Sequence, residues 1–219
     1  MKPYYEQDGI TIYHGDCRDV LPHLPAVTAI VTDPIWPNAA VEFRGAGDPV
    51  WLFRAALRCL ERAHTLPKRL AVHLGCDSDP RFLLAVPNVL PFFRVAWLEY
   101  VRPHYKGALM YTGDVAYLYG QPEPSWARAR VIPGRMILTK NDFASAKANG
   151  HPTPRQLMHV RWLIKWWGGP TILDPFVGSG TTLVAAKDRG CAAIGIETEE
   201  RYCEIAARRL DQQVLDLGV

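Results

Sequence analysis

The chain has 219 residues, of which 48% are hydrophobic and 21% charged, and its formal net charge is +3. This balance is typical of a folded globular protein with a sizeable core, and it excludes intrinsic disorder and a fibrous repeat. The weakly basic charge permits a polyanionic partner without requiring one. No stretch approaches the roughly 20 consecutive apolar residues of a membrane span, and no signal-peptide core follows Met1, so we expect a cytoplasmic protein without a membrane segment. The 5 cysteines include no Cys-x-x-Cys pair, so we expect neither a disulfide framework nor a metal site.

In the N-terminal half, two predicted strands are each ended by a turn that contains an aspartate. Asp16 follows the first of these strands and Asp33 follows the second. The next apolar stripe has helical spacing and starts at Pro49, which suits the first turn of a helix. Two later strand-like runs are expected to pair as a hairpin across 103–113, and a long connection is expected over 120–150. The predicted strands are 10–13, 26–32, 69–74, 92–101 and 114–119, and the predicted helix is 49–63.

From residue 151 onwards, helices and strands alternate. Thr153 is predicted to be the N-cap of a helix that starts with Pro154 and stops at Gly168-Gly169. The segments predicted after it are strand 171–174, helix 181–189, strand 192–196 and helix 199–210. This βαβα order implies a right-handed crossover and a parallel sheet. We therefore predict a doubly wound, mostly parallel α/β fold in a single domain over 1–219, with its ligand site at the carboxyl ends of the strands.

A glycine loop follows the predicted strand at 171–174. Gly178 and Gly180 would let a ligand approach the backbone closely, and the helix N-terminus behind them presents free N–H groups. The loop is no Walker A motif because no lysine follows the second glycine, and Leu183 stands where a dinucleotide fingerprint has its third glycine. Glu197 closes the next strand, about where α/β sites place a carboxylate on ribose hydroxyls. The loop fits a ribose-bearing cofactor, and an ordinary β-to-α turn with a surface glutamate is the alternative.

Four motifs in one order resemble the amino-directed DNA methyltransferases of the permuted β class. ILDPFVGSGTTLVAA at 172–186, followed by Gly195-Ile196-Glu197, resembles their S-adenosylmethionine site, and Asp33-Pro34-Ile35-Trp36 resembles their catalytic Asp-Pro-Pro-Tyr/Trp motif. His151-Pro152-Thr153-Pro154 resembles their His-Pro-Thr segment, and Gly15-Asp16 also matches. The resemblance covers most of the chain. It implies a Rossmann-like methyltransferase fold with permuted motif order, S-adenosylmethionine as cofactor and double-stranded DNA as partner.

The same resemblance assigns residues to the site. It implies that Glu197 holds the ribose hydroxyls, that Asp16 holds the adenine amino group of the cofactor, and that His151 and Thr153 lie near its methionine end. The implied cofactor-binding residues are Asp16, His151, Thr153, Asp174, Phe176, Gly178, Gly180, Thr181 and Glu197. The implied catalytic residues are Asp33, Pro34 and Trp36.

Methyl transfer to an exocyclic amine requires acceptors for the N–H bonds of that amine. The Asp33 carboxylate and the Pro34 carbonyl can each accept one such hydrogen bond, and Trp36 offers a face on which a flipped-out base can stack. Ile35 departs from the family pattern, which has a second proline there, so the turn loses some preorganisation. A DNA-binding protein that keeps the cofactor site but has weak catalysis is therefore one alternative, and an RNA methyltransferase is another.

The opening aspartate of the motif bears on the target atom. In the resembled family an aspartate at this position accompanies adenine targets more often than cytosine targets. We therefore expect methylation of adenine N6, with cytosine N4 as the alternative.

Residues 125–170 form a basic run in which Asp142 is the single acid. With Trp126 and Phe143 the run is typical of a phosphate-binding surface, although a solvated face is the usual explanation. We expect a small target-recognition region at 102–150, whose size leaves open a short DNA site or a second subunit in a homodimer. The expected DNA-binding residues are Arg128, Arg130, Arg135, Lys140 and Lys147. Further members of the run are Arg155, Arg161 and Lys165.

Overall fold

The computed structural model describes residues 1–36, 47–122, 132–139 and 155–215. Within these ranges, no helix is long and apolar enough to cross a membrane. The site residues that were predicted from the sequence but lie outside the described residues are Arg128, Arg130, Lys140, Lys147, His151 and Thr153.

The described chain forms one mixed sheet with the strand order β1-β2-β9-β8-β3-β4-β6-β5-β7. The five neighbouring strands from β2 to β4 in this order are parallel, and β6 is antiparallel to both β4 and β5. The expected doubly wound, mostly parallel α/β sheet is confirmed. The strands are β1 (Tyr5–Gln7), β2 (Ile10–His14), β3 (Ala29–Thr32), β4 (Arg69–Leu74), β5 (Phe92–Lys106), β6 (Leu109–Gly120), β7 (Arg135–Ile137), β8 (Thr171–Asp174) and β9 (Ala192–Glu197).

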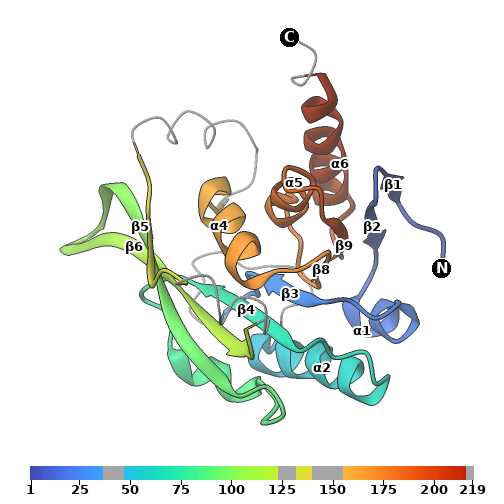
Figure 1. Cartoon of the computed structure of the whole chain (residues 1–219), viewed down its shortest axis with the longest axis horizontal. Coiled ribbons are helices and arrows are strands. Elements are labelled where there is room, and N and C mark those ends of the chain that lie inside the picture. Colours follow the sequence, from blue (N-terminus) through green and yellow to red (C-terminus); the bar gives the residue numbers. More distant parts are fainter. Residues whose placement is uncertain (37–46, 123–131, 140–154, 216–219) are drawn as a thin grey trace.

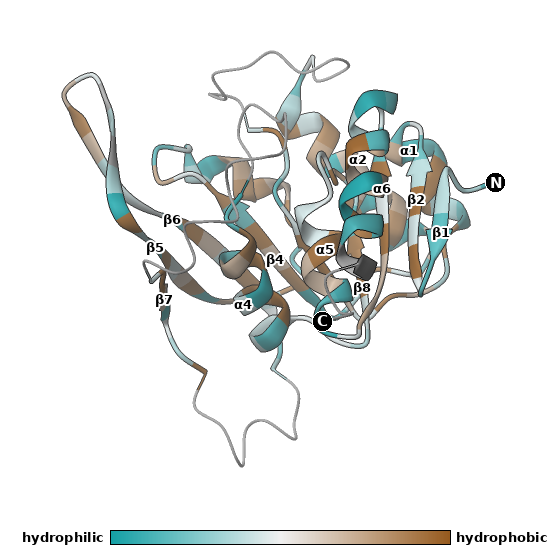
Figure 2. Ribbon diagram, turned by 90° about the horizontal axis from the view of Figure 1, so that it is seen from above, coloured by the Kyte–Doolittle hydropathy of each residue, from teal (hydrophilic) through white to brown (hydrophobic). Residues whose placement is uncertain are grey.

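Helices cover both faces of the sheet (Figure 1). On one face α4, α5 and α6 pack against the strands around Trp167 and Leu183, and on the other α1 and α2 pack around Phe53 and Leu57. Their outer surfaces are hydrophilic, whereas the strands between them are largely hydrophobic (Figure 2). The helices are α1 (Cys17–Val20), α2 (Pro49–Arg62), α4 (Leu157–Trp167), α5 (Thr181–Lys187) and α6 (Glu200–Leu215), with 3-10 turns η1 (Leu21–His23) and η2 (Pro80–Ala85).

The carboxyl edge of the parallel strands collects acidic residues. Strands β9 and β8 end with Glu197 and Asp174, and Asp33 directly follows β3. Asp16 follows β2 after Gly15, whose N–H donates to the Glu197 carbonyl oxygen at 2.9 Å. Because β2, β9, β8 and β3 are consecutive in the sheet, all four acids lie along one edge.

The β5–β6 hairpin is longer than expected. Its strands continue to Lys106 and Leu109 and turn at Gly107, whose φ is 59°, so most of the expected 103–113 connection is strand. Val115 of β6 pairs with Leu74, the last residue of β4, so the preceding residues of β6 extend beyond the carboxyl edge. The hairpin therefore projects from the body of the molecule (Figures 1 and 2).

Two other elements differ from the sequence-based expectation. Helix α4 begins at Leu157 with an extended Gln156 as its N-cap, not at Thr153. Arg155, which lies just before this N-cap, donates a hydrogen bond to the Asp33 carboxylate. This contact occurs where a further helical turn was expected. The expected connection over 120–150 contains β7, which gains its strand pairing from β5 and not from its own sequence pattern.

Candidate active site

Glu197 ties the glycine loop to the turn after β9. Its Oε2 accepts a hydrogen bond from the Gly178 N–H at 2.9 Å, and its Oε1 accepts one from the Glu199 N–H at 2.8 Å. Burial raises the pKa of the Glu197 carboxyl group, and the backbone donors partly offset this effect. A carboxylate oxygen has two lone pairs. Oε2 can therefore accept a further hydrogen bond, and Oε1 can accept one in place of the long bond that the Thr198 hydroxyl donates to it at 3.4 Å. The residues present therefore fit a ligand that carries two neighbouring hydroxyl groups.

Gly180 is required by packing between helices. Its φ of 83° favours glycine, and a Cβ added here would lie 2.7 Å from the Cβ of Ala206 in α6. From the same helix, Arg209 donates hydrogen bonds to the Ser179 carbonyl at 2.5 Å and to the Thr181 hydroxyl at 3.2 Å. Helix α6 thus braces the glycine loop from behind, a role that the sequence pattern does not reveal.

Asp174 connects the glycine loop to the end of β3. Its Oδ1 accepts hydrogen bonds from the Thr32 hydroxyl at 2.7 Å and from the Phe176 N–H at 3.1 Å. Its side chain is buried, and burial is the main cause that raises the pKa of Asp174 to about 6. The nearby Asp33 carboxylate raises that pKa further. Because Thr32 directly precedes Asp33, this hydrogen bond places the predicted cofactor loop beside the predicted catalytic turn.

Asp16 is the N-cap of α1. Its Oδ1 accepts hydrogen bonds from the backbone N–H and the Nε of Arg18, both at 2.8 Å. These bonds lower the pKa of Asp16, and the Arg18 guanidinium lies 5.0 Å from the centre of the Trp51 ring. The side chain of Asp16 is 29% exposed, so a ligand amino group can still reach it.

Arg155 joins two of the three predicted catalytic residues. Its Nε donates to Asp33 Oδ2 at 2.6 Å and its Nη2 donates to Asp33 Oδ1 at 2.9 Å. The same guanidinium lies 4.5 Å from the centre of the Trp36 ring. Trp36 also packs against the end of β4, since a Cβ at Gly75 would lie 3.5 Å from its ring.

A second carboxylate holds Arg155 from the opposite side. Arg155 Nη1 donates to Asp114 Oδ2 at 2.8 Å, and His73 Nε2 lies 3.2 Å from the same oxygen. Tyr100 also hydrogen-bonds the Asp114 carboxylate. Despite burial, the contacts from His73, Arg155 and Tyr100 together lower the pKa of Asp114 well below its ordinary value. The predicted catalytic turn is therefore backed by a buried network of charged and polar groups.

This network was not predicted from the sequence. The available signal was that His73 and Asp114 are polar residues within two predicted strands, 69–74 and 114–119. Arg155 was counted only as a member of the basic run, but its side chain is 13% exposed and faces the catalytic turn. The pairing of Arg155 with Asp33 joins residues far apart in the chain, and a local sequence pattern does not predict such a contact.

The remaining described members of the basic run are surface residues with nearby partners. Arg135 in β7 is 66% exposed and lies 3.7 Å from the Glu99 carboxylate. Arg161 in α4 pairs with Asp188 after α5. Of the expected DNA-binding residues that the structure describes, Arg135 is thus accessible to a phosphate.

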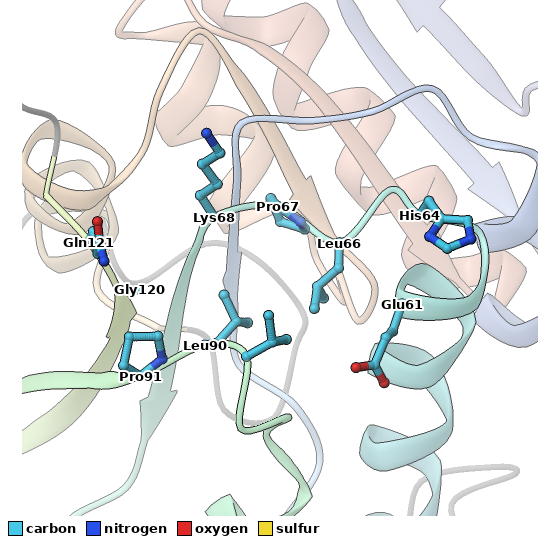
Figure 3. A pocket seen from close by; sticks show the side chains of 10 residues that line it. Glu61, His64, Leu66, Pro67, Lys68, Leu90, Pro91, Gly120 and Gln121 are labelled. Carbon is cyan, nitrogen blue, oxygen red and sulfur yellow. The ribbon is translucent and has the colours of Figure 1, made fainter.

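A hollow of about 490 Å³ lies at the opposite edge of the sheet (Figure 3). It is lined by residues such as Lys68, which precedes β4, and Gly120, which ends β6. Since Asp33, Asp174 and Glu197 lie at the carboxyl ends of the strands, this hollow is separate from the candidate active site.

Comparisons with known proteins bear on the family and the fold of this chain. The model of the N6/N4 methyltransferase family, described as DNA methylase, matches residues 125–208. YubD of Escherichia coli (strain K12), whose name describes it as a methylase, is 31% identical over 210 residues, which cover 90% of this chain and 88% of YubD. The structure of the M1.HpyAVI-SAM complex is similar with a TM-score of 0.68 at 20% identity, over 92% of this chain and 99% of that chain. The cytosine-N4-specific PvuII DNA methyltransferase has a TM-score of 0.68 at 14% identity, over 95% and 88% of the two chains.

The chain belongs to the N6/N4 DNA methylase family. It is a DNA amino-methyltransferase, and the resemblance found in its sequence motifs is confirmed. The solved structures confirm the Rossmann-like methyltransferase fold.

Proposed function

We propose that this chain transfers the methyl group of S-adenosylmethionine to N6 of adenine in double-stranded DNA, within one domain whose recognition region spans about 102–150. The observation that carries the proposal is the hydrogen bond from Thr32 to Asp174, which joins the Asp33 turn to the glycine loop at one sheet edge. The Asp33 turn, which offers acceptors for an amine, therefore lies next to the glycine loop, which offers a site for a nucleoside cofactor. Glycine loops at this edge bind nucleosides in many α/β proteins.

S-adenosylmethionine supplies a methyl group on a positively charged sulfur. Glu197 holds the ribose hydroxyls with the lone pair that its bond to Gly178 leaves on Oε2, and on Oε1 in place of the long bond from the Thr198 hydroxyl. Asp16 accepts a hydrogen bond from the adenine amino group, and Asp174 and Phe176 line the path between these ends. His151 and Thr153 complete the methionine end. The supporting observation is that the strands carrying Asp16, Glu197 and Asp174 are consecutive in the sheet.

The target amine is oriented by the catalytic turn. The Asp33 carboxylate and the Pro34 carbonyl accept its two N–H bonds, so that its lone pair points at the methyl carbon. As the N–C bond forms and the C–S bond breaks, the nitrogen becomes positive, and the negative charge of Asp33 stabilises that change. The electron pair of the C–S bond would stay on the sulfur, and the extra proton would pass from the nitrogen to solvent water. Trp36 stacks on the extruded base, a contact worth about 1–3 kcal/mol.

DNA approaches the carboxyl edge, beside the projecting β5–β6 hairpin. The hairpin exposes Tyr105, Leu109 and Met110 near its tip, and Arg135 lies on the adjoining strand β7. Between Glu99 and Asp114 the sequence contains basic residues and no acid. These features suit contact with a duplex, to which Arg128, Arg130, Lys140 and Lys147 add phosphate-binding charge.

The target atom is tested by product analysis. Purified protein is incubated with duplex DNA and S-adenosylmethionine labelled in its methyl group, and the DNA is then digested to nucleosides that are separated by mass. We expect labelled N6-methyladenine. Labelled N4-methylcytosine alone would move the chain to the cytosine-N4 class, to which the PvuII enzyme belongs. Label in structured RNA but not in DNA, or in neither, would contradict the proposal.

A further inference from the structure

We infer that Arg155 is a positioning residue for the proposed methyl transfer, because its single guanidinium fixes both the Asp33 carboxylate and one face of Trp36. The inference rests on the proposed function. Both oxygens of Asp33 accept a hydrogen bond from this guanidinium, at 2.6 and 2.9 Å, and the Trp36 ring centre lies 4.5 Å away.

The paired hydrogen bonds set the plane of the Asp33 carboxylate. A guanidinium binds a carboxylate as a planar fork, which leaves little freedom about the terminal torsion of the aspartate. Each oxygen keeps a lone pair for the N–H of the target amine. Arg155 thus holds the acceptor in place without using up its capacity.

Arg155 also determines which face of Trp36 is open. Because the guanidinium covers one side of the indole, an extruded base stacks on the other side. The catalytic turn lacks the second proline of the resembled family and has Ile35 there, so its own sequence restrains it less. The contacts of Arg155 with Asp33 and Trp36, here called the clamp, supply that restraint.

The anchor of the clamp is Asp114. This carboxylate is 7% exposed and binds Arg155 at 2.8 Å, while His73 holds it from the far side at 3.2 Å. If Arg155 swung away to admit a base, Asp33 and Asp114 would both lose this cation, which is costly for the buried Asp114 carboxylate. The geometry therefore favours a guanidinium that stays during the reaction over one that merely fills the base pocket until DNA arrives.

The test compares Arg155→Ala and Arg155→Lys with the unaltered protein. We expect the alanine variant to lower kcat by about 100-fold, the cost of a small misplacement of a reacting group. Its KM for DNA and Kd for S-adenosylmethionine should stay within about threefold, since no substrate contact is lost. Lysine should restore part of kcat, because it keeps the charge but not the planar fork. Arg208→Ala is the matched control, since Arg208 is 71% exposed and pairs with Glu204 within α6.

Each other outcome overturns the inference. A faster alanine variant would show that Arg155 plugs the base pocket, and an unchanged kcat with a raised KM would make it a DNA contact. If Arg155→Ala does not fold, Arg155→Ala combined with Asp114→Asn removes the uncompensated buried charge, and the same loss of kcat is expected. A lysine variant with the original kcat would also contradict the clamp. If the unaltered protein is active and the Arg155 variants have the same kcat, this inference alone is wrong. If the unaltered protein transfers no methyl group, the proposed function is wrong as well.

Discussion

At the scale of single residues, Asp33 carries the proposed chemistry. Asp33→Ala should lower turnover to near the limit of detection while the affinity for S-adenosylmethionine stays within about threefold, because the lost hydrogen bond matters most in the transition state. Methyl transfer and calorimetry measure the two quantities. Asp33→Asn serves as the comparison, since it keeps one acceptor oxygen for Arg155 and the amine. Normal turnover by the alanine variant would refute the role of Asp33.

Glu197 has a cofactor role and a structural role that one substitution can separate. Glu197→Ala should weaken S-adenosylmethionine binding, since each hydrogen bond to a carboxylate is worth about 1.5–3 kcal/mol. It should also lower the free energy of unfolding, because the N–H groups of Gly178 and Glu199 lose their acceptors. Calorimetry and denaturant unfolding measure these effects. Glu199→Ala is the control, since the Glu199 side chain contacts Arg201 at 3.3 Å and no group of the loop. An unchanged dissociation constant for Glu197→Ala would remove this residue from the cofactor site.

At the scale of elements, the packing of α5 against α6 depends on Gly180. Gly180→Ala places a Cβ 2.7 Å from Ala206 and keeps an unfavourable φ of 83°, whereas Gly190→Ala meets a φ of 65° with open space around it. The second substitution should cost about 1–2 kcal/mol of stability for backbone strain alone. We expect Gly180→Ala to cost clearly more, since overpacking adds about 1–3 kcal/mol. Urea unfolding of both variants gives the difference, and equal losses would mean that α6 moves aside freely.

At the scale of the whole molecule, the buried His159 links stability to pH. Burial, with a smaller effect from His73, lowers the pKa of His159 to about 4, below the ordinary value of 6.5. The unfolded chain therefore binds a proton more readily, so this contribution to stability is complete above pH 6.5 and is lost as the pH falls toward 4, by up to about 3 kcal/mol. Asp174 acts in the opposite direction, because its pKa of about 6 lies above that of the unfolded chain.

The substitution His159→Gln isolates this term. Glutamine can still donate to the Glu99 carbonyl oxygen, which His159 Nε2 contacts at 3.1 Å. Urea unfolding at intervals from pH 7 to pH 4 should show a smaller loss of stability on acidification in the variant than in the unaltered protein. Parallel curves for the two proteins would show that His159 does not titrate as expected.

Much of the fold was predictable because its signals are local. The β-branched run before Asp33 and the alternating elements after residue 170 predicted the parallel sheet, and strands β4 and β8 match their predicted bounds. The start of α4, the strand β7 and the length of the hairpin were not predicted. These features depend on pairing with distant segments, such as β7 with β5, and a propensity pattern does not encode such partners.

The sequence by itself determined that acids end four strands, that a glycine loop follows one of them, and that the motifs occur in the order of a DNA amino-methyltransferase. Strand ends and turns are set by neighbouring residues, so the chain order alone displays them. Only the tertiary structure decided that Arg155 lies between Asp33 and Asp114, and that α6 packs on Gly180. Such contacts join residues far apart in the chain, and they form only when the sheet brings those residues to one edge. The physical reason is that burial and charge pairing are properties of the assembled fold and not of any short segment.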